Sequence, residues 1–541
     1  MSEFKSQIDR ESEEFKKNRE DMLKLVDRMR ILEKRARDLS EKRKPRFRER
    51  SQLTPRERLS HLLDPGLPFL ELYNMSNYLV DDENPDTSIP GGNILSGIGF
   101  VNGVRSMVMV DDSGINAGAS TTKSVEKALG ILKIAEKQKL PFIHLVESAG
   151  ANLMNYTVEL WAHGGGMFHG LALLSAAGIP TITVLHGPST AGGAYQPGMS
   201  DYVIGVKKNG MAALAGAALV RAATGEVSTD DELGGVEMHS TKSGLIEYVA
   251  ENDAHGISIA RDIVGRLNWN HSFEKKCNNK KIKRPYFDSS DIAGIVPIDY
   301  KKQYDVRELA SCIVDGSEFV DFKPDYGVST VCLQSEICGW SCGIIANNGP
   351  IDPNGANKAA QFMQLCDGAN IPLIFLNNTT GYMVGKKYEE AGMIKHGAKM
   401  IQAVSNIKVP KISLYIGASF GAGNYGMCGY AYRPDFLFTW PNAWTGVMGG
   451  EQAALTMRQV LINSSKRKGK QLDEKQLAIQ EKAIINHFDR QSDAFFTSGR
   501  GLDHGMIDPR DTRKVLAFAL ETCWEGKNRV LKQNSFGIAR L

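Results

Sequence analysis

The sequence predicts an α/β protein built from two homologous halves in tandem. One pattern occurs twice: a proline, alternating β-branched and polar residues, a glycine, and then a cluster of small residues before a tyrosine. The first copy, PTITVLHGPSTAGGAY, spans residues 180–195, and the second, PKISLYIGASFGAGNY, spans residues 410–425. Gly187 and Gly417 lie 230 residues apart. A repeat of this length indicates a duplicated domain, because solenoid repeats are ~20–50 residues long.

Neighbouring segments keep nearly the same spacing. The stretch PFIHLVESAG at 141–150 aligns with PLIFLNNTTG at 372–381 at an offset of 231. Two further matches, at an offset of 234, are Asp201 with Asp435 and Ala215-Gly216 with Gly449-Gly450. Short apolar runs such as 106–110 and 142–146 are typical of buried strands, and stripes such as 125–137 are typical of the helices that follow them. This alternation predicts parallel sheets with crossover helices.

A charged helical segment is expected before the first half, from about Glu11 to Lys44. Its apolar residues recur on one helical face, as an amphipathic helix requires: Met22, Leu25, Val26, Met29 and Leu32. We expect this helix to pack on the body of the protein or on a partner subunit. The lysine-rich stretch from His271 to Arg284 is the best linker, and the helical tail beyond Arg510 is expected to pack on the second half. The expected divisions are therefore a helical extension (1–50) and two domains (51–275 and 276–541).

Composition excludes several classes of protein. A net charge of +3 is too small to indicate nucleic-acid binding, and no apolar run approaches the ~18–20 residues of a membrane span. The eight cysteines form no C-x-x-C pair, which argues against a zinc ribbon and favours free thiols in a reducing compartment. The polar start, which contains acidic residues, differs from a signal or transit peptide. The cytoplasm is the expected location.

Each repeated unit reads as a buried strand that enters a glycine turn and then a helix. The first backbone N–H groups of a helix have no partner within it, and the helix dipole favours negative charge there. Glycines let another molecule approach that backbone closely. Such a site can stabilise an oxyanion and lower a reaction barrier by several kcal/mol.

The side chains offer one competing interpretation, a serine hydrolase. Gly417 to Gly421 reads GASFG, which matches the G-x-S-x-G nucleophile elbow of serine hydrolases, with His487 and His504 downstream. The first copy reads GPSTA and lacks the final glycine, which weakens this hypothesis. Three histidines (His163, His186 and His396) are isolated, and neither a P-loop nor a dinucleotide fingerprint is found. A site made mainly of backbone N–H groups fits better, and its base must come from a substrate or cofactor.

At these motifs the chain resembles the carboxyltransferase (β) subunits of biotin-dependent acyl-CoA carboxylases, over essentially residues 20–540. The matching segments occur in the family's order: PRERLSHLLDPGLPFLEL, SAGAN, STAGGAY, AATGE, GIVP, YDVRE, IVDGSEF, KHGAKM, GAGNYGMCG and MGGEQAA. The resemblance implies a crotonase-like fold for each half, with the active site between halves and usually across a dimer interface. It also implies that one half binds acyl-CoA and the other binds carboxybiotin. The biotin anion left by carbon dioxide release removes the substrate proton, and the enolate attacks the carbon dioxide.

We call the group of backbone amides at each glycine turn a nest. Carried over from the family by position, the first nest consists of Gly192 and Gly193, which would hold the thioester enolate. The second nest consists of Ala422 and Gly423, which would hold the ureido oxyanion of biotin. The remaining substrate-binding candidates are Gly150, Ala213, Gly216, Gly381 and Gly450. No metal is expected on this chain. The resemblance also implies a separate biotin-carrying (α) subunit, since the chain lacks the biotin-attachment motif AMKM, and a complex of six copies of each.

GAGNYGMCG and MGGEQAA are closer to the methylcrotonyl-CoA and geranyl-CoA branch than to the propionyl-CoA branch. Where that branch carries bulky residues and prolines, this chain has an alanine-rich segment at 212–218, which suggests room for a larger acyl chain such as geranyl. Core repacking is the alternative reason for these alanines. Trp444 stands where an arginine is usual, and Glu147 where aspartate is more common. A propionyl-type carboxylase, a sodium-pump decarboxylase subunit and a serine hydrolase remain as alternatives.

Overall fold

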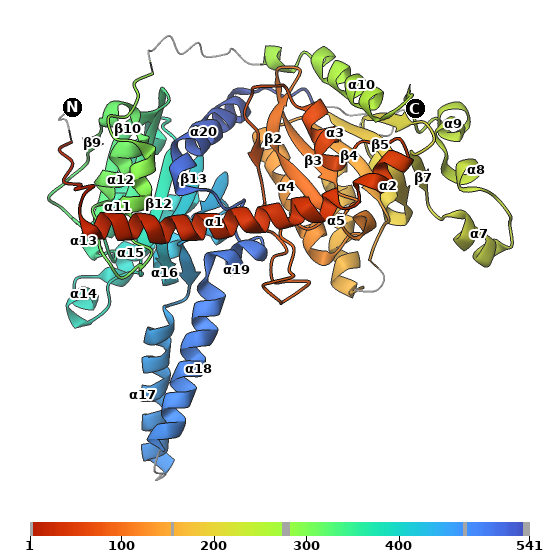
Figure 1. Cartoon of the computed structure of the whole chain (residues 1–541). Helices are drawn as coiled ribbons and strands as arrows, with labels where there is room; N and C mark the ends of the chain where they lie inside the picture. Colours follow the sequence, from red (N-terminus) through yellow and green to blue (C-terminus); the bar gives the residue numbers. More distant parts are fainter. Residues whose placement is uncertain (1–3, 153–155, 273–281, 469–472, 534–541) are drawn as a thin grey trace. The chain divides into compact units, whose positions relative to one another are not determined.

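The structure is a computed structural model that describes residues 4–152, 156–272, 282–468 and 473–533. Its contacts divide the chain into two compact units (Figure 1). The first-half unit comprises Ile31–Cys277 and Thr522–Leu541. The second-half unit comprises Met1–Arg30 and Asn278–Glu521. Each unit therefore combines one half of the repeat with a segment from the opposite end of the chain.

Among the described residues, the first-half unit contains an eight-stranded sheet in the order β1-β2-β3-β4-β5-β6-β8, with β7 paired to β5. The strands are β1 Leu70–Glu71, β2 Ile94–Val101, β3 Val104–Asp111, β4 Phe142–Ser148, β5 Thr181–Thr190, β6 Tyr202–Val206, β7 Met211–Ala213 and β8 Tyr248–Ala250. The pairs β1–β2 and β2–β3 are antiparallel, and the pairs from β3 onward are parallel. All residues of β3 and β4 are buried, as expected for parallel strands covered on both faces.

The helices of this unit are α2 Lys44–Glu49, α3 Pro55–Leu62, α4 Thr122–Gln138, α5 Val158–Ala176, α6 Tyr195–Gly198, α7 Ala217–Thr224, α8 Asp230–Gly234, α9 Val236–Met238 and α10 Asp253–Arg266, with short turns η1 Asn116–Gly118, η3 Ala191–Ala194, η4 His239–Ser243 and η5 Trp269–Ser272. Helix α4 begins at a capping box in which Thr121 and Ser124 satisfy each other's backbone amides. This helix and the strands β3 and β4 confirm the elements expected at 125–137, 106–110 and 142–146.

The described part of the second-half unit contains a seven-stranded sheet in the order β14-β13-β12-β11-β10-β9, with β15 paired to β13. The strands are β9 Val320–Asp321, β10 Thr330–Ile337, β11 Trp340–Asn347, β12 Leu373–Thr379, β13 Lys411–Phe420, β14 Phe436–Thr439 and β15 Trp444–Gly446. The helices are α11 Ile292–Ile295, α12 Val306–Ile313, α13 Pro353–Gly368, α14 Lys386–Glu390, α15 Met393–Asn406, α16 Gly421–Gly426, α17 Gly450–Lys468, α18 Glu474–Ser492 and α19 Ala494–Gly499, with short turns η6 Ser289–Asp291, η7 Asp315–Ser317, η8 Tyr430–Tyr432 and η9 Pro509–Asp511. In Figure 1, α17 and α18 form a helical pair that extends away from the second sheet.

The strands β1 to β7 and β9 to β15 follow the same order in their sheets, which confirms the duplicated α/β fold, and the first sheet has the additional edge strand β8. Ser189 of β5 pairs with Ser148 of β4, and Ser419 of β13 pairs in the same way with Thr379 of β12. The expected match at Asp201 and Asp435 also holds, since each carboxylate accepts the amide that begins β5 or β13.

The register beyond these strands differs by one residue from the sequence alignment. Ser189 pairs with Ala212, and Ser419 pairs with Thr445, so the offset here is 233. Gly216 therefore corresponds to Gly449, not to Gly450. The first half has one glycine here, Gly216, and the second has two, Gly449 and Gly450, so the sequence alone did not show which of the two corresponds to Gly216.

The N-terminal helix α1, Glu13–Glu41, is present as expected. Four residues of its stripe are buried, namely Met22, Val26, Met29 and Leu32, and Leu25 is half-buried. The segment before α1 contacts the second half: Arg10 forms an ion pair with Asp291 (2.6 Å), and Ser6 donates to Glu308. The stripe therefore packs on the chain itself.

The helical tail is α20, Thr512–Asn528, but its expected packing was only partly right. From Thr522 onward the chain belongs to the first-half unit. Glu525 forms an ion pair with the buried Arg105 (3.2 Å), and the Arg529 guanidinium lies 4.7 Å from the Trp269 ring centroid. Burying Arg105 requires a negative partner, and Glu525 provides it. Most of the expected linker lies outside the described residues.

Within the part of the chain that the structure describes, no helix is long and apolar enough to cross a membrane. Seven cysteines fall in this part, and all are free thiols.

Candidate functional site

The first nest lies where β5 ends. Thr190 has extended backbone and does not cap the turn η3 with its side chain, so the first amides of the turn are left without a side-chain acceptor. Ala191 enters the turn with a left-handed φ of 53°. Gly192 is exposed, and a Cβ on Gly193 would lie 3.0 Å from the Ser189 Oγ. The amides of this nest are thus available to an exposed ligand.

The second nest repeats this arrangement where β13 ends. Phe420 precedes α16 without capping it, and Gly421 has a left-handed φ of 55°. Ala422 is exposed and Gly423 is buried. A Cβ on Gly423 would lie 2.8 Å from the Gly381 Cα, so only glycine fits there.

The structure brings Gly150 to the first nest and Gly381 to the second. Both have left-handed φ, 81° and 126°, and both donate their amides to the hydroxyl two residues before, Ser148 Oγ or Thr379 Oγ1. A Cβ on Gly150 would lie 3.4 Å from the Thr190 carbonyl oxygen. These glycines shape the strand end beside each nest, and their own amides are already occupied.

A donor that the sequence did not reveal follows each of these glycines. The Ser120 amide donates to the Gly150 carbonyl oxygen, and the Asn152 amide donates to the Ser120 carbonyl oxygen. The amide of Ala151, which lies between Gly150 and Asn152, takes part in neither hydrogen bond. In the second half, Ile351 forms the equivalent bridge, which leaves out the Tyr382 amide in the same way. Neither the Ala151 nor the Tyr382 amide has a partner among the described residues. Each half therefore presents amides from two chain segments, a strand end and a helix start.

The remaining candidates lie farther from exposed amides. Gly216 is the N-cap of α7, whose first amide, on Ala217, donates to Asp230. A Cβ on Gly450 would lie 2.6 Å from Asp489 Oδ1 in α18, so Gly450 allows close helix packing. Ala213 pairs with Thr190 but is buried, and its Cβ lies 2.9 Å from the place a Gly234 Cβ would take. Its methyl group faces α8.

Comparison with known proteins decides the family. A family described as the carboxyl transferase domain matches residues 46–536. The chain belongs to this carboxyl transferase family. It is 46% identical to a probable biotin-dependent acyl-coenzyme A carboxylase β2 subunit of Mycobacterium tuberculosis, over 92% of each chain. It is 41% identical to the mitochondrial methylcrotonoyl-CoA carboxylase β chain of Arabidopsis thaliana, over 99% of this chain and 91% of that one.

A solved structure agrees with these sequence matches. The β subunit of geranyl-CoA carboxylase from P. aeruginosa is 46% identical, covers 100% of both chains and superposes with a TM-score of 0.93. The tandem α/β fold and the enzyme class expected from the sequence, a carboxyltransferase subunit of the acyl-CoA carboxylase type, are thereby confirmed.

The carboxyltransferase geometry also argues against the serine hydrolase. Ser419 is fully buried, and its hydroxyl donates to Asn377 Oδ1 (3.0 Å) and accepts from Asn424 Nδ2 (2.8 Å). Asn424 Nδ2 also contacts the hydroxyl oxygen of Tyr415 (3.1 Å). The ring nitrogen Nδ1 of His504 accepts the Leu437 amide, far along the sheet from a nucleophile. The serine therefore braces the second nest.

The first nest of the carboxyltransferase is backed by a buried ionic cluster instead. Arg58 bonds to Glu147 (2.6 Å) and to Asp253 (2.8 Å), and Asp253 bonds to His186 Nδ1 (2.9 Å). The side chain of Glu147 lies across Gly187, where a Cβ would overlap the Glu147 Cγ. Glu147 thus has a structural role that depends on its length.

The pKa values in this cluster follow from burial and its partners. Burial, with the charge of Arg58, lowers the pKa of His186. Burial by itself raises the pKa of Asp253, but the charge interaction and hydrogen bond with His186, together with the charge of Arg58, outweigh it and lower the pKa to about 2.

Trp444 belongs to an aromatic cluster beside the second nest. The Tyr300 ring lies 5.3 Å from the Phe420 ring and 6.0 Å from the Trp444 ring, between centroids. Phe420 directly precedes the nest. The wall behind the second nest is thus aromatic at Trp444.

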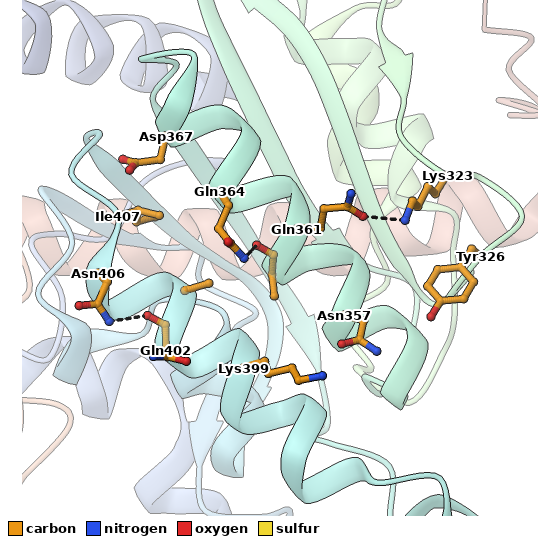
Figure 2. A pocket seen from close by; sticks show the side chains of 12 residues that line it. Lys323, Tyr326, Asn357, Gln361, Gln364, Asp367, Lys399, Gln402, Asn406 and Ile407 are labelled. Carbon is orange, nitrogen blue, oxygen red and sulfur yellow. Dashed lines mark hydrogen bonds between the residues drawn. The ribbon is translucent and has the colours of Figure 1, made fainter.

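A polar groove of about 680 Å³ lies between α13 and α15 in the second-half unit (Figure 2). Lys323 at one end donates to Gln361, and the side chains of Asn357, Gln402 and Asn406 line the rims. None of the expected site residues lines this groove. Among the described residues, no group of three or more His, Cys, Asp or Glu could hold a metal ion.

Proposed function

We propose that this chain moves a carboxyl group from carboxybiotin to an unsaturated, branched acyl-CoA of the geranyl-CoA or 3-methylcrotonyl-CoA type. The observation that carries the proposal is the pair of uncapped amide nests at equivalent places in the two sheets. Each offers backbone N–H donors to a developing negative charge, and such donors are worth several kcal/mol in a transition state. The relatives named for methylcrotonoyl-CoA and geranyl-CoA carboxylases support the substrate class.

Gly192 and Gly193, with the nearby Ala151 amide, are proposed to bind the thioester oxygen as the enolate forms. Gly150 and Gly216 shape the turns around it. The exposed Ala422 and the neighbouring Gly423, with the Tyr382 amide, are proposed to bind the ureido oxygen of biotin, and Gly381 and Gly450 hold that backbone in place. The fit rests on the chemistry of the donors: neutral N–H groups at a helix start match a small anionic oxygen. Biotin, when bound, supplies the carboxyl group and the base.

The proposed domain divisions stay at 1–50, 51–275 and 276–541. We further propose that a separate biotin-carrying subunit and further copies of this chain, six of each, complete the enzyme. Exposed apolar residues on the α17–α18 pair, Leu455, Val460 and Ile479, support an oligomer. A cytoplasmic location is proposed, and cell fractionation tests it against the mitochondrial location named for the Arabidopsis relative.

The test uses the tagged chain isolated with its biotinylated partner. ATP and labelled bicarbonate are supplied, and acid-stable label is counted on propionyl-, 3-methylcrotonyl- and geranyl-CoA. We expect label on the two branched unsaturated substrates, highest on geranyl-CoA. Label on propionyl-CoA alone would move the chain to the propionyl-type branch. No label on any of the three, with a membrane-bound partner, would favour a decarboxylase subunit.

A further inference from the structure

Ser189 and Ser419 occupy the same place in the two halves but have different surroundings. Each lies on the long strand just before a nest, and each pairs with the hydroxyl residue of the neighbouring strand, Ser148 or Thr379. Both side chains are fully buried. The two residues therefore provide a comparison within one chain.

In the second half, three side chains surround the serine hydroxyl. Ser419 bonds to Asn377 and Asn424, and Asn424 also reaches Tyr415. Since Asn424 lies within α16, these bonds fix the second nest on its strand. A fully bonded buried network of this kind is rigid.

In the first half, the equivalent residues are Val146, Leu185 and Ala194. Val146 and Leu185 belong to a buried apolar cluster, and Ala194 packs against it. None of them offers a side-chain hydrogen-bond partner. The Ser189 hydroxyl is buried and has no partner among the described residues. An unbonded buried hydroxyl costs roughly 1–3 kcal/mol, so its retention calls for an explanation.

The Ser189 hydroxyl faces the first nest. Its oxygen lies 3.0 Å from the place where a Cβ on Gly193 would stand. The nest itself is less regular than its counterpart: Ala191–Ala194 form a 3₁₀ turn, whereas Gly421–Gly426 form an α-helix. Ala191 is also held in the left-handed region, which is unfavourable for a residue with a side chain.

We propose that Ser189 is a positioning residue of the first nest, whose hydroxyl donates to a backbone carbonyl oxygen of the turn when an acyl thioester is bound and leaves the amides of Gly192 and Gly193 to the thioester oxygen. In the free protein the Ser189 hydroxyl does not hold the turn, because it has no partner among the described residues. When the thioester oxygen accepts hydrogen bonds from the amides of Gly192 and Gly193, the turn takes one fixed conformation and the Ser189 hydroxyl gains its partner. The first nest thus adapts to its ligand, while the second is rigid beforehand. This inference rests on the proposed function, which assigns acyl-CoA to the first nest.

The test compares Ser189→Ala with Ser419→Ala in the full chain isolated with its partner. For Ser189→Ala we expect a melting temperature equal to or above that of the wild type, because an unbonded hydroxyl is removed. We also expect kcat/KM for the acyl-CoA to fall about five- to tenfold, the worth of one hydrogen bond of about 1–1.4 kcal/mol, with the KM for free biotin unchanged. For Ser419→Ala we expect a lower melting temperature, because Asn377 and Asn424 lose a partner.

Hydrogen exchange over residues 189–195 gives a readout that does not need turnover. Acyl-CoA should slow exchange of the turn in the wild type and do so less in Ser189→Ala. If Ser189→Ala lowers the melting temperature as Ser419→Ala does, the hydroxyl already has a partner such as a buried water, and the inference is overturned. Unchanged kcat/KM and unchanged exchange would overturn it as well. Failure of the wild type to carboxylate any acyl-CoA would instead refute the proposed function.

Discussion

Ala191 and Gly421 stand at the same place in the two halves, and both adopt left-handed backbone, with φ of 53° and 55°. The left-handed conformation is unfavourable by about 1–2 kcal/mol for a residue with a Cβ, and glycine has no such penalty. Ala191→Gly should therefore stabilise the protein by roughly 0.5–1 kcal/mol after the extra entropy of an unfolded glycine is subtracted. Gly421→Ala should destabilise it by about 1–2 kcal/mol. Chemical denaturation of both variants measures the difference, and a loss of stability in Ala191→Gly would contradict the strained conformation.

Gly187 and Gly417 also correspond, and each lies under a side chain of the neighbouring strand. A Cβ on Gly187 would overlap the stem of Glu147, which is tied to Arg58, and a Cβ on Gly417 would overlap the amide end of Asn378. Gly187→Ala should break the buried ion pair and cost about 3–5 kcal/mol, while Gly417→Ala, which meets a half-buried amide, should cost about 1–2 kcal/mol. Thermal unfolding compares the two, and equal costs would show that Glu147 moves freely.

The Asp253 carboxylate should make the protein sensitive to acid. Its pKa falls from 3.8 to about 2 in the folded protein, so it contributes stability that is present above pH 4 and is lost as the pH falls toward 2. This contribution is about 2 kcal/mol. Asp253→Asn should flatten the dependence of unfolding free energy on pH between 4 and 2, whereas Asp262→Asn, an exposed site on the same helix, should leave the slope unchanged.

Gly423→Ala should disable the second nest. Its Cβ would lie 2.8 Å from the Gly381 Cα and 3.1 Å from its carbonyl carbon, which are backbone atoms that cannot rotate away. The displaced amides should lower kcat about 10²–10³-fold, the usual cost of losing one oxyanion donor. Gly368→Ala is the matched control, because a Cβ there meets nothing within 4 Å. Carboxylation rates with labelled bicarbonate decide the comparison.

Substrate size can be probed at the alanine-rich segment. Ala213 is a poor site for this test, because its methyl group faces Gly234, and a phenylalanine there would overpack the core by about 1–3 kcal/mol. Ala218, on α7, is exposed. Ala218→Phe should lower kcat/KM for geranyl-CoA more than for 3-methylcrotonyl-CoA. Equal losses on both substrates would favour core repacking as the reason for the alanines.

The repeat in the sequence predicted the fold and the two strand-to-turn units at which the nests are proposed, because proline, glycine and tyrosine mark the same turns twice. The pattern could not show which amides remain unbonded. Gly150 and Gly381 were expected among the substrate-binding residues, and the structure shows that their amides bond to Ser148 and Thr379, whereas the neighbouring Ala151 and Tyr382 amides are left over. That distinction depends on strand bridges, which join residues distant in the sequence.

The G-x-S-x-G match failed for a related reason. A nucleophile needs an exposed serine and a nearby histidine, and the motif records neither. Asn377, 42 residues before Ser419, decides its role by accepting its hydroxyl. The tail was misplaced because the partner of Glu525 is Arg105, more than 400 residues away. Long-range charge pairs leave no local pattern.

The way each unit takes a segment from the opposite end of the chain sets the timing of its folding during synthesis. Arg10 leaves the ribosome early, but its partner Asp291 follows only after about 280 further residues, which takes tens of seconds at roughly 5–20 residues per second. Strands β1 to β8 are likewise synthesised long before Glu525 and Arg529, which belong to the same unit. A nascent chain must therefore keep two incomplete cores protected until its last helix appears, and neither half can be cut out at the linker and produced alone without losing part of its own core.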